Sequence, residues 1–256
     1  MKTPARWFVF FLAVAATAAS PGTLGTGRIS GPDISLDGLS ARLDQQIAAM
    51  GTIVMRETIS RYDTARGGTG KIDEFEASVE IADGVDRLAS LRRNGRPYSG
   101  VTPLQGAWAF GDFSTVLRVS RQALGEQGAN LVRYSDGEPG ILITRFHCPA
   151  SNALWFVSVD SRIYWLDFQV EIRISATTGD VVEISWTSSP PTPDAEIRQI
   201  RRTVAFASSE VGGRTYLLPT YAEYRVVHSR NRVEWNTARF GNAARYDALA
   251  SVKYVE

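Results

Sequence analysis

The central third of the chain carries a strict alternation of apolar and polar residues. Apolar side chains occupy every second position: Tyr164, Leu166, Phe168, Val170, Ile172 and Ile174. Successive side chains of a strand point to opposite faces, so this pattern predicts a strand with one buried and one solvated face. Turn residues at 177–180 and a second alternation that runs through Trp186 predict an antiparallel hairpin.

Shorter alternations of the same kind lie on both sides of this hairpin. One runs from Phe75 to Ile81, between glutamate and serine residues. Asn94 and Gly95 then predict a two-residue hairpin turn, because both central positions of a type I′ turn need positive φ. The last third predicts further short strands at residues 200–206, 216–218, 222–226, 233–235 and 252–254.

Two stretches have helical rather than strand spacing. Between residues 39 and 62, apolar side chains recur at intervals of three to five positions, after a cap at Ser35 or Asp37. This stripe consists of Leu39, Leu43, Ile47, Met50, Val54 and Ile59. Residues 111–125 predict a second, shorter helix.

The fold class that follows is α+β. We expect a strongly curved, mostly antiparallel β-sheet, either a half-barrel or an open barrel, with an N-terminal helix and a short internal helix. No period of about 20 to 50 residues repeats, which excludes a solenoid or a propeller.

The first residues have the pattern of a secretory signal peptide. Lys2 and Arg6 supply positive charge, residues 7–16 form an apolar run, and small residues follow as a cleavage site. The run is shorter than the roughly 20 residues of a membrane-spanning helix, and a retained N-terminal anchor is the alternative. We expect export to the periplasm or the exterior, with no integral membrane span after cleavage. The expected division is a signal peptide at 1–19, a flexible leader at 20–34, an N-terminal helical segment at 35–65 and a half-barrel domain at 66–256.

Charge and cysteine content narrow the classes of function. The 28 basic and 27 acidic residues give a net charge of +1, which argues against nucleic acid as a partner. We interpret the arginines at 92–96 and 198–202 as solvated sheet faces, with an anion site as the alternative. The single cysteine, Cys148, has no partner for an internal disulfide, and its strand context predicts that it is buried.

Few residues stand in arrangements that indicate catalysis. His147 and His228 are too few for a three-histidine zinc site, and neither HExxH nor paired CxxC occurs, so we expect no metal and no cofactor. His147 and Cys148 are neighbours in a strand pattern and point to opposite faces, which argues against a thiolate and imidazolium pair. A carboxylate pair such as Asp160 and Asp167 leaves a hydrolase as an alternative, but we expect no enzyme and no catalytic residues.

The buried face of the curved sheet is the better candidate for function. It must be covered by a helix, a second sheet, a partner or a ligand. The candidate residues on this face are Trp155, Tyr164, Leu166, Phe168, Val170, Trp186 and Trp235. The alternative is that they fill an ordinary core.

Several sequence blocks resemble an uncharacterised family of exported bacterial proteins. The blocks are KIDEFEA at 71–77, RNGRP at 93–97, GAWAFGDF at 106–113, GRTYLLP at 213–219, RVEW at 232–235 and ASVKY at 250–254. The second half of that family is similar to the lipoprotein-carrier (LolA-like) half-barrel. The resemblance implies a curved sheet that holds acyl chains or other apolar matter against helices on its concave side. Members of that family often have cysteines near the hairpin that follows the Leu-Pro strand, and residues 221–235 of this chain have none.

These observations predict a non-enzymatic envelope protein that binds a lipid, a lipidated protein or another apolar partner in the concavity of its sheet. A structural or interaction module of an envelope assembly is one alternative, and it predicts a flat exposed apolar patch. A hydrolase is the other, and it predicts a polar cleft with converging carboxylates or histidine.

Overall fold

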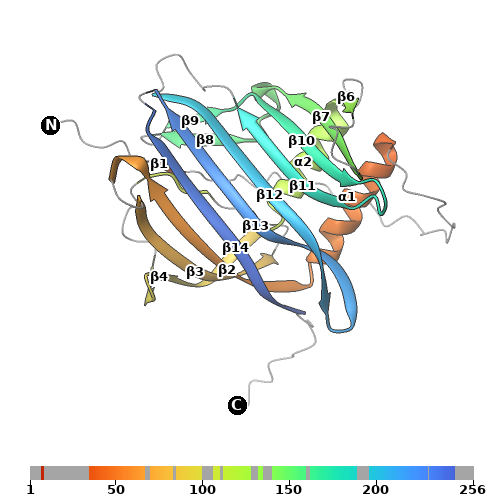
Figure 1. Cartoon of the computed structure of the whole chain (residues 1–256), viewed down its shortest axis with the longest axis horizontal. Coiled ribbons are helices and arrows are strands. Elements are labelled where there is room, and N and C mark those ends of the chain that lie inside the picture. Colours follow the sequence, from red (N-terminus) through yellow and green to blue (C-terminus); the bar gives the residue numbers. More distant parts are fainter. Residues whose placement is uncertain are drawn as a thin grey trace, which may run out of the picture.

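The chain forms one large open sheet, one small sheet and two helices over the residues described in the computed structural model (Figure 1). The described residues are 7–8, 35–66, 70–82, 85–99, 106–109, 112–127, 132–134, 140–159, 162–188, 196–229 and 231–245. All strand pairs are antiparallel and the large sheet is not closed, so the expected fold class is confirmed.

The large sheet has eleven strands. In spatial order they are β5 (Arg96–Pro97), β4 (Val85–Arg93), β3 (Lys71–Ala82), β2 (Ile53–Asp63), β14 (Val233–Arg245), β13 (Arg214–His228), β12 (Ile197–Val211), β11 (Val181–Ser188), β10 (Phe168–Ser175), β7 (Ile141–Cys148) and β6 (Val132–Tyr134). The small sheet has the order β1 (Trp7–Phe8), β8 (Phe156–Val159) and β9 (Arg162–Trp165). The helices are α1 (Leu36–Met50) and α2 (Thr115–Gln127), and short 3-10 turns lie at Thr64–Arg66 and Ala150–Asn152.

Both helices lie on the same face of the large sheet (Figure 1). Helix α1 packs on α2 and on β13, and α2 packs on β7. We call the face that they cover the inner face and the opposite one the outer face. The hydrophobic core lies between the helices and the inner face.

The central hairpin forms as the sequence predicts. Strands β10 and β11 pair with Val170 opposite Trp186, and the inner positions of β10 are all buried. Asn94 and Gly95 also form the predicted turn, with φ values of 48° and 75°. The alternation from Tyr164 to Ile174 nevertheless belongs to two strands rather than one. Tyr164 lies in β9 of the small sheet, and the chain leaves that sheet before β10 begins at Phe168.

The predicted N-terminal helix is correct only in its first half. Ser35 caps α1, its side chain accepting a hydrogen bond from the Gly38 N–H, and the helix ends at Met50. The rest of the expected helical segment is strand β2, which contains Val54 and Ile59. The helical prediction beyond Met50 is therefore wrong, because the buried residues of this stretch alternate with period two and several of them are charged.

The two short strands predicted at 216–218 and 222–226 are one long strand, β13. Pro219, between them, lies opposite Phe206 at a shift in the register with β12. Proline donates no hydrogen bond to a ladder, and such an irregularity accommodates it. The strand predicted at 252–254 and the flexible leader at 20–34 lie outside the described residues, as does the predicted signal peptide at 1–19 except Trp7–Phe8.

Cys148 is fully buried at the end of β7, as predicted. His147, its neighbour, is exposed on the outer face, so the two side chains do point to opposite sides of the sheet. They cannot form a catalytic pair in this arrangement.

Candidate functional site

On the inner face of the large sheet, one row of paired residues changes from apolar to polar, and we name the two halves of the sheet after this row. The polar half also buries apolar side chains, such as Ile59, Phe75 and Val204. The row of directly paired residues crosses both halves: Phe146, Val170, Trp186, Arg202, Tyr224, Asn236, Arg61 and Asp73. Every member is buried. The row is apolar from β7 to β11 and polar from β12 to β3, so the two halves meet between Trp186 and Arg202.

Five of the residues that the sequence predicts for the apolar face lie in the buried core. Trp155, Leu166, Phe168, Val170 and Trp186 are each at most 2% exposed. Trp155 and Trp186 contact each other with ring centroids 5.3 Å apart, and both contact Phe168. The structure therefore brings these five residues together as the packed core of the apolar half.

The other two candidates lie elsewhere. Tyr164 lies in the small sheet, where it is partly exposed and packs against the outside of the same core. Trp235 lies on the outer face, where its ring stacks on Tyr62 at 4.8 Å, because its neighbours Glu234 and Asn236 take the buried positions of β14. The prediction that Trp235 lies on the buried inner face is therefore wrong.

We call Arg202, Tyr224, Asn236, Arg61 and Asp73 the polar row, after their places in neighbouring strands. Within it, the Arg61 guanidinium donates from Nε and Nη2 to the two carboxylate oxygens of Asp73, at 2.6 and 2.8 Å. Arg93 of β4 donates to the same carboxylate at 2.8 Å. Both side chains of the Arg61 and Asp73 pair are at most 1% exposed. Bidentate pairing of this kind is the strongest form of an arginine–carboxylate contact.

The polar row holds a segment of the chain against the sheet. The Ala107 carbonyl accepts a hydrogen bond from Arg61 at 3.4 Å, and the Trp108 ring lies 5.4 Å from the Arg61 guanidinium. Asp112, further along the same segment, accepts from Arg202 Nε at 2.7 Å. Arg202 was expected on a solvated face, but it is fully buried because Asp112 reaches it from the covering segment. The described parts of the segment, 106–109 and 112–114, therefore close the polar half.

A second buried charge cluster lies at the end of β14, one row away. Arg232 donates to Asp63 at 2.7 Å and also binds Glu234. His228 lies 3.8 Å from Glu234, with both side chains almost fully buried. The two clusters place carboxylates and a histidine near one another, but each carboxylate already has an arginine partner.

Glu57 of β2 is buried on the same inner face. Burial raises its pKa well above the usual 4.5, and the nearby carboxylates of Asp112 and Asp86 raise it further, while Arg202 opposes them. Burial also raises the pKa of the Tyr224 phenol. Both groups are therefore held in their neutral forms, which a buried site without a matching charge favours.

We expect a Glu57→Gln variant to be more stable than the natural chain at neutral pH. Below about pH 4.5 the folded and unfolded states both keep the proton on Glu57. As the pH rises above that value the unfolded state releases its proton first, so the free energy of unfolding falls; glutamine removes this loss. Urea unfolding over a pH series would measure it. A gain of equal size at every pH would contradict ionisation as its cause.

Helix α2 is attached to the sheet by polar contacts at its N-terminal end and near its middle. The Asp86 carboxylate of β4 accepts hydrogen bonds from the N–H groups of Ser114 and Thr115, at 2.8 and 3.2 Å, and so caps the helix. Further along, Ser120 accepts from Trp186 Nε1 at 2.9 Å inside the core. The predicted short internal helix is confirmed, and these contacts fix its position over the apolar half.

Helix α1 is attached differently. It buries Leu39, Leu43 and Met50 in the core. Its polar contacts with other elements lie at the rim: Arg42 to the Thr178 carbonyl at 3.2 Å, Gln46 to the Leu217 carbonyl at 3.4 Å, and Asp44 to Arg121 at 3.0 Å. The Arg42 contact is exposed and the Asp44–Arg121 ion pair lies at the surface, so these two add little stability. Gln46 is buried, and its bond to Leu217 is worth about 0.5–1.5 kcal/mol. The apolar side chains supply most of what holds α1 in place.

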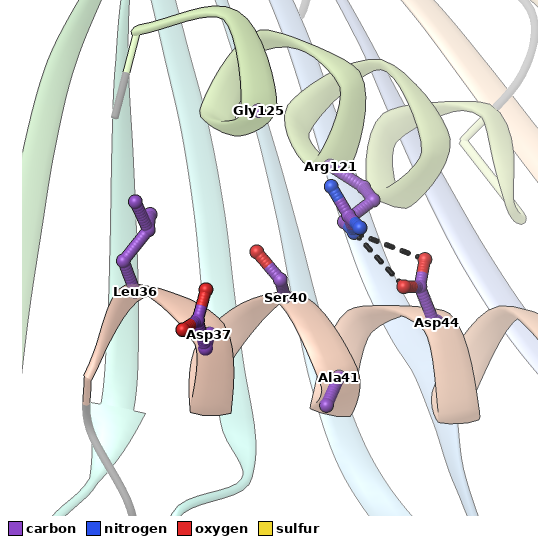
Figure 2. A pocket seen from close by; sticks show the side chains of 7 residues that line it. All are labelled: Leu36, Asp37, Ser40, Ala41, Asp44, Arg121 and Gly125. Atoms are coloured by element: carbon purple, nitrogen blue, oxygen red, sulfur yellow. Dashed lines mark hydrogen bonds and ion pairs between the residues drawn. The ribbon is translucent and has the colours of Figure 1, made fainter. Parts of the chain in front are cut away.

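A cleft of about 440 Å³ lies between the two helices (Figure 2). Its lining consists of Leu36, Asp37, Ser40, Ala41, Asp44, Arg121 and Gly125. The Arg121 guanidinium reaches across from α2 to the Asp44 carboxylate of α1 (Figure 2). The cleft therefore marks the seam along which α1 meets α2.

Other candidate chemistry is limited in the described part of the chain. No group of three or more His, Cys, Asp or Glu residues there could hold a metal ion. Asp167 is exposed and accepts from the Ala150 N–H at 2.7 Å, and Asp160 lies outside the described residues. None of the helices described is both long enough and apolar enough to cross a membrane.

Comparison with known proteins gives a distant likeness. No protein-family model and no curated protein matches the sequence. A solved structure of a LolA superfamily protein from Nitrosomonas europaea matches over 87% of this chain and 98% of its own, with 9% identity and a TM-score of 0.36. A DUF1329 family protein from Desulfovibrio piger matches over 89% of this chain and 98% of its own, with 10% identity and a TM-score of 0.30. Both likenesses are distant.

Proposed function

We propose that the chain is a non-enzymatic envelope protein that binds a lipid, a lipidated protein or another apolar partner on the inner face of its large sheet, in the place that α1 occupies beside α2 and β13. The observation that carries the proposal is the unequal attachment of the two helices. Helix α2 is capped by Asp86 and bonded to Trp186, whereas α1 rests on apolar side chains and rim contacts.

The free-energy cost of such an exchange is small. Displacing α1 exposes the apolar surfaces that Leu39, Leu43 and Met50 cover, at about 1.5–3 kcal/mol for each side chain. An acyl chain or an apolar helix that takes the same place buries these surfaces again, so one set of apolar contacts replaces another. Breaking the exposed contacts of Arg42 and Asp44 costs little in water, and breaking the buried Gln46 contact costs about 0.5–1.5 kcal/mol. The polar half stays closed, since Arg61 keeps its bond to the Ala107 carbonyl and Arg202 keeps its pairing with Asp112.

The buried charge clusters favour a structural role over hydrolysis. Their carboxylates accept hydrogen bonds from Arg61, Arg202 and Arg232, and the side chains of Asp73 and Glu234 are each 1% exposed. A hydrolase needs converging carboxylates at a cleft that substrate and water reach. In the cleft between α1 and α2, the Asp44 carboxylate is instead paired with the Arg121 guanidinium.

Bridging α1 to α2 tests the proposal. Cysteines at Asp44 and Arg121 can be joined by a short reagent that reacts with two thiols, while the natural Cys148 is fully buried. We expect the bridged chain to bind a fluorescent long-chain fatty acid about tenfold more weakly, or worse, than the same variant treated with a reagent that blocks each thiol singly. Equal binding in both forms would show that α1 need not move. Absence of binding in both forms would overturn the proposal.

A further inference from the structure

Strand β9 carries the two large apolar side chains that are exposed in the described part of the chain. Ile163 is 59% exposed and Trp165 is 36% exposed. Both point to the same side of the small sheet, because they are two positions apart. Trp165 packs edge-on against Phe156 of β8, with ring centroids 5.1 Å apart, so its ring is held in one orientation.

The backbone of β9 has an open edge on the side away from β8. The strand order places β9 at the margin of the small sheet. The Leu166 N–H donates to the Trp155 carbonyl at 2.8 Å, so the polar backbone groups of residue 166 face β8. Those of successive residues alternate between the two edges of a strand. The N–H and C=O groups of Ile163 and Trp165 therefore face outward, and no partner for them is seen among the described residues.

We propose that β9 is a contact surface for a second copy of this chain, and that the two β9 edges pair antiparallel about a two-fold axis at Tyr164. In this register Ile163 lies opposite Trp165 of the second copy, and Trp165 lies opposite its Ile163. Both pairs exchange both of their backbone hydrogen bonds, since the polar groups of these residues face the open edge. The same pairs also bring each exposed isoleucine beside an exposed tryptophan, which is a stabilising cross-strand combination.

The charges near the edge agree with this register. Arg162, the nearest cation, lies opposite Leu166 of the second copy, so like charges do not face each other. A two-fold contact in which each copy offers the same surface closes after two chains. The surface is small, because β9 has four residues, and the dimer is therefore weak and dependent on concentration. Insertion of this edge into a membrane is disfavoured, because its outward N–H and C=O groups would lose water without gaining partners.

Sedimentation of the purified protein over a range of concentrations is the first test. We expect a monomer–dimer equilibrium that Ile163→Lys weakens about tenfold or more, since a charge at the centre of an edge opposes strand pairing. Ile163 is exposed, so this change should leave the thermal unfolding temperature unchanged. Gln199→Lys, which adds the same charge at an exposed position of β12, should dimerise as the natural chain does. A natural chain that stays monomeric, or a dimer that Ile163→Lys does not weaken, would overturn the proposal.

Cross-linking tests the register itself. Residues opposite each other in a hydrogen-bonded pair have Cα atoms about 5.5 Å apart, within reach of a disulfide. A mixture of Ile163→Cys chains and Trp165→Cys chains should therefore form mixed disulfide dimers faster than either variant forms its own. Equal rates would contradict the register. Flotation with anionic phospholipid vesicles, by a chain that remains monomeric, would assign this edge to a membrane surface instead and would likewise overturn the proposal.

Discussion

Replacing Arg202 by methionine is expected to lower the free energy of unfolding by about 3–5 kcal/mol. Arg202 is fully buried, and the Asp112 side chain that it binds is 8% exposed. Methionine fills much of the same volume, so the loss comes from a carboxylate left in the interior without its partner. Equilibrium unfolding in guanidinium chloride, followed by tryptophan fluorescence at neutral pH, measures it.

Two further variants separate this cause from others. Arg56→Met breaks the ion pair with Glu76, whose side chains are 54% and 33% exposed, and should cost no more than about 1 kcal/mol. Arg202→Met combined with Asp112→Leu removes both charges. It should recover much of the lost stability, because no unpaired carboxylate is then left in the interior. If the double variant were no more stable than Arg202→Met alone, loss of packing rather than loss of pairing would be the cause.

The same buried charges explain which parts of the fold could be predicted from the sequence. Strands β3, β10 and β11 were predictable because their buried positions are mostly apolar, so alternation and turn residues agree. In β2 the buried set includes Glu57, Arg61 and Asp63. Pattern reasoning places charges in solvent, and it therefore missed the period of two and continued the helix through Val54 and Ile59.

The misplacement of Trp235 has the same cause. On β14 the buried residues include Glu234 and Asn236, so the inner face of this strand is polar and the aromatic side chain lies outside. No local signal marks such an inversion. The polar inner positions Glu234 and Asn236 lie opposite Asp63 and Arg61 of β2, which are distant in sequence and come beside them only once the sheet has formed. The polar row itself was missed for this reason, although Asp73 and Asp112 both belong to the sequence blocks shared with the resembling family.

The break between β9 and β10 was missed for a different reason. Alternation continues without interruption from Tyr164 to Phe168, because both strands bury alternate residues against the same core. Between residues 164 and 174, the period of two therefore gives the buried face correctly, but it does not show which sheet each strand joins. The exposure of Ile163 and Trp165, on which the proposed dimer depends, follows from that change of sheet.

Replacing Trp186 by alanine is expected to cost about 3–5 kcal/mol, the usual range for a large aromatic side chain in a packed core. Trp186 is fully buried where the apolar and polar halves meet, with Trp155 at 5.3 Å, Phe168 at 5.5 Å and the Arg202 guanidinium 5.5 Å from its ring. Alanine leaves a cavity at this junction and removes the hydrogen bond that ties α2 to the sheet through Ser120. Denaturant unfolding of the variant measures the sum of both effects.

Two matched variants divide that sum and test the two faces of the sheet. Trp186→Phe keeps most of the packing and removes the indole donor, so it should cost about 1–2 kcal/mol through the lost bond to Ser120 and the smaller ring. Trp235→Ala makes the same truncation on the outer face, where the partly exposed ring stacks on Tyr62, and should also cost about 1–2 kcal/mol. The order of stability should therefore place Trp186→Ala well below the other two. Were Trp235→Ala the most destabilised, the inner face assigned to the sheet would be wrong, and the binding surface proposed under α1 would be wrong with it.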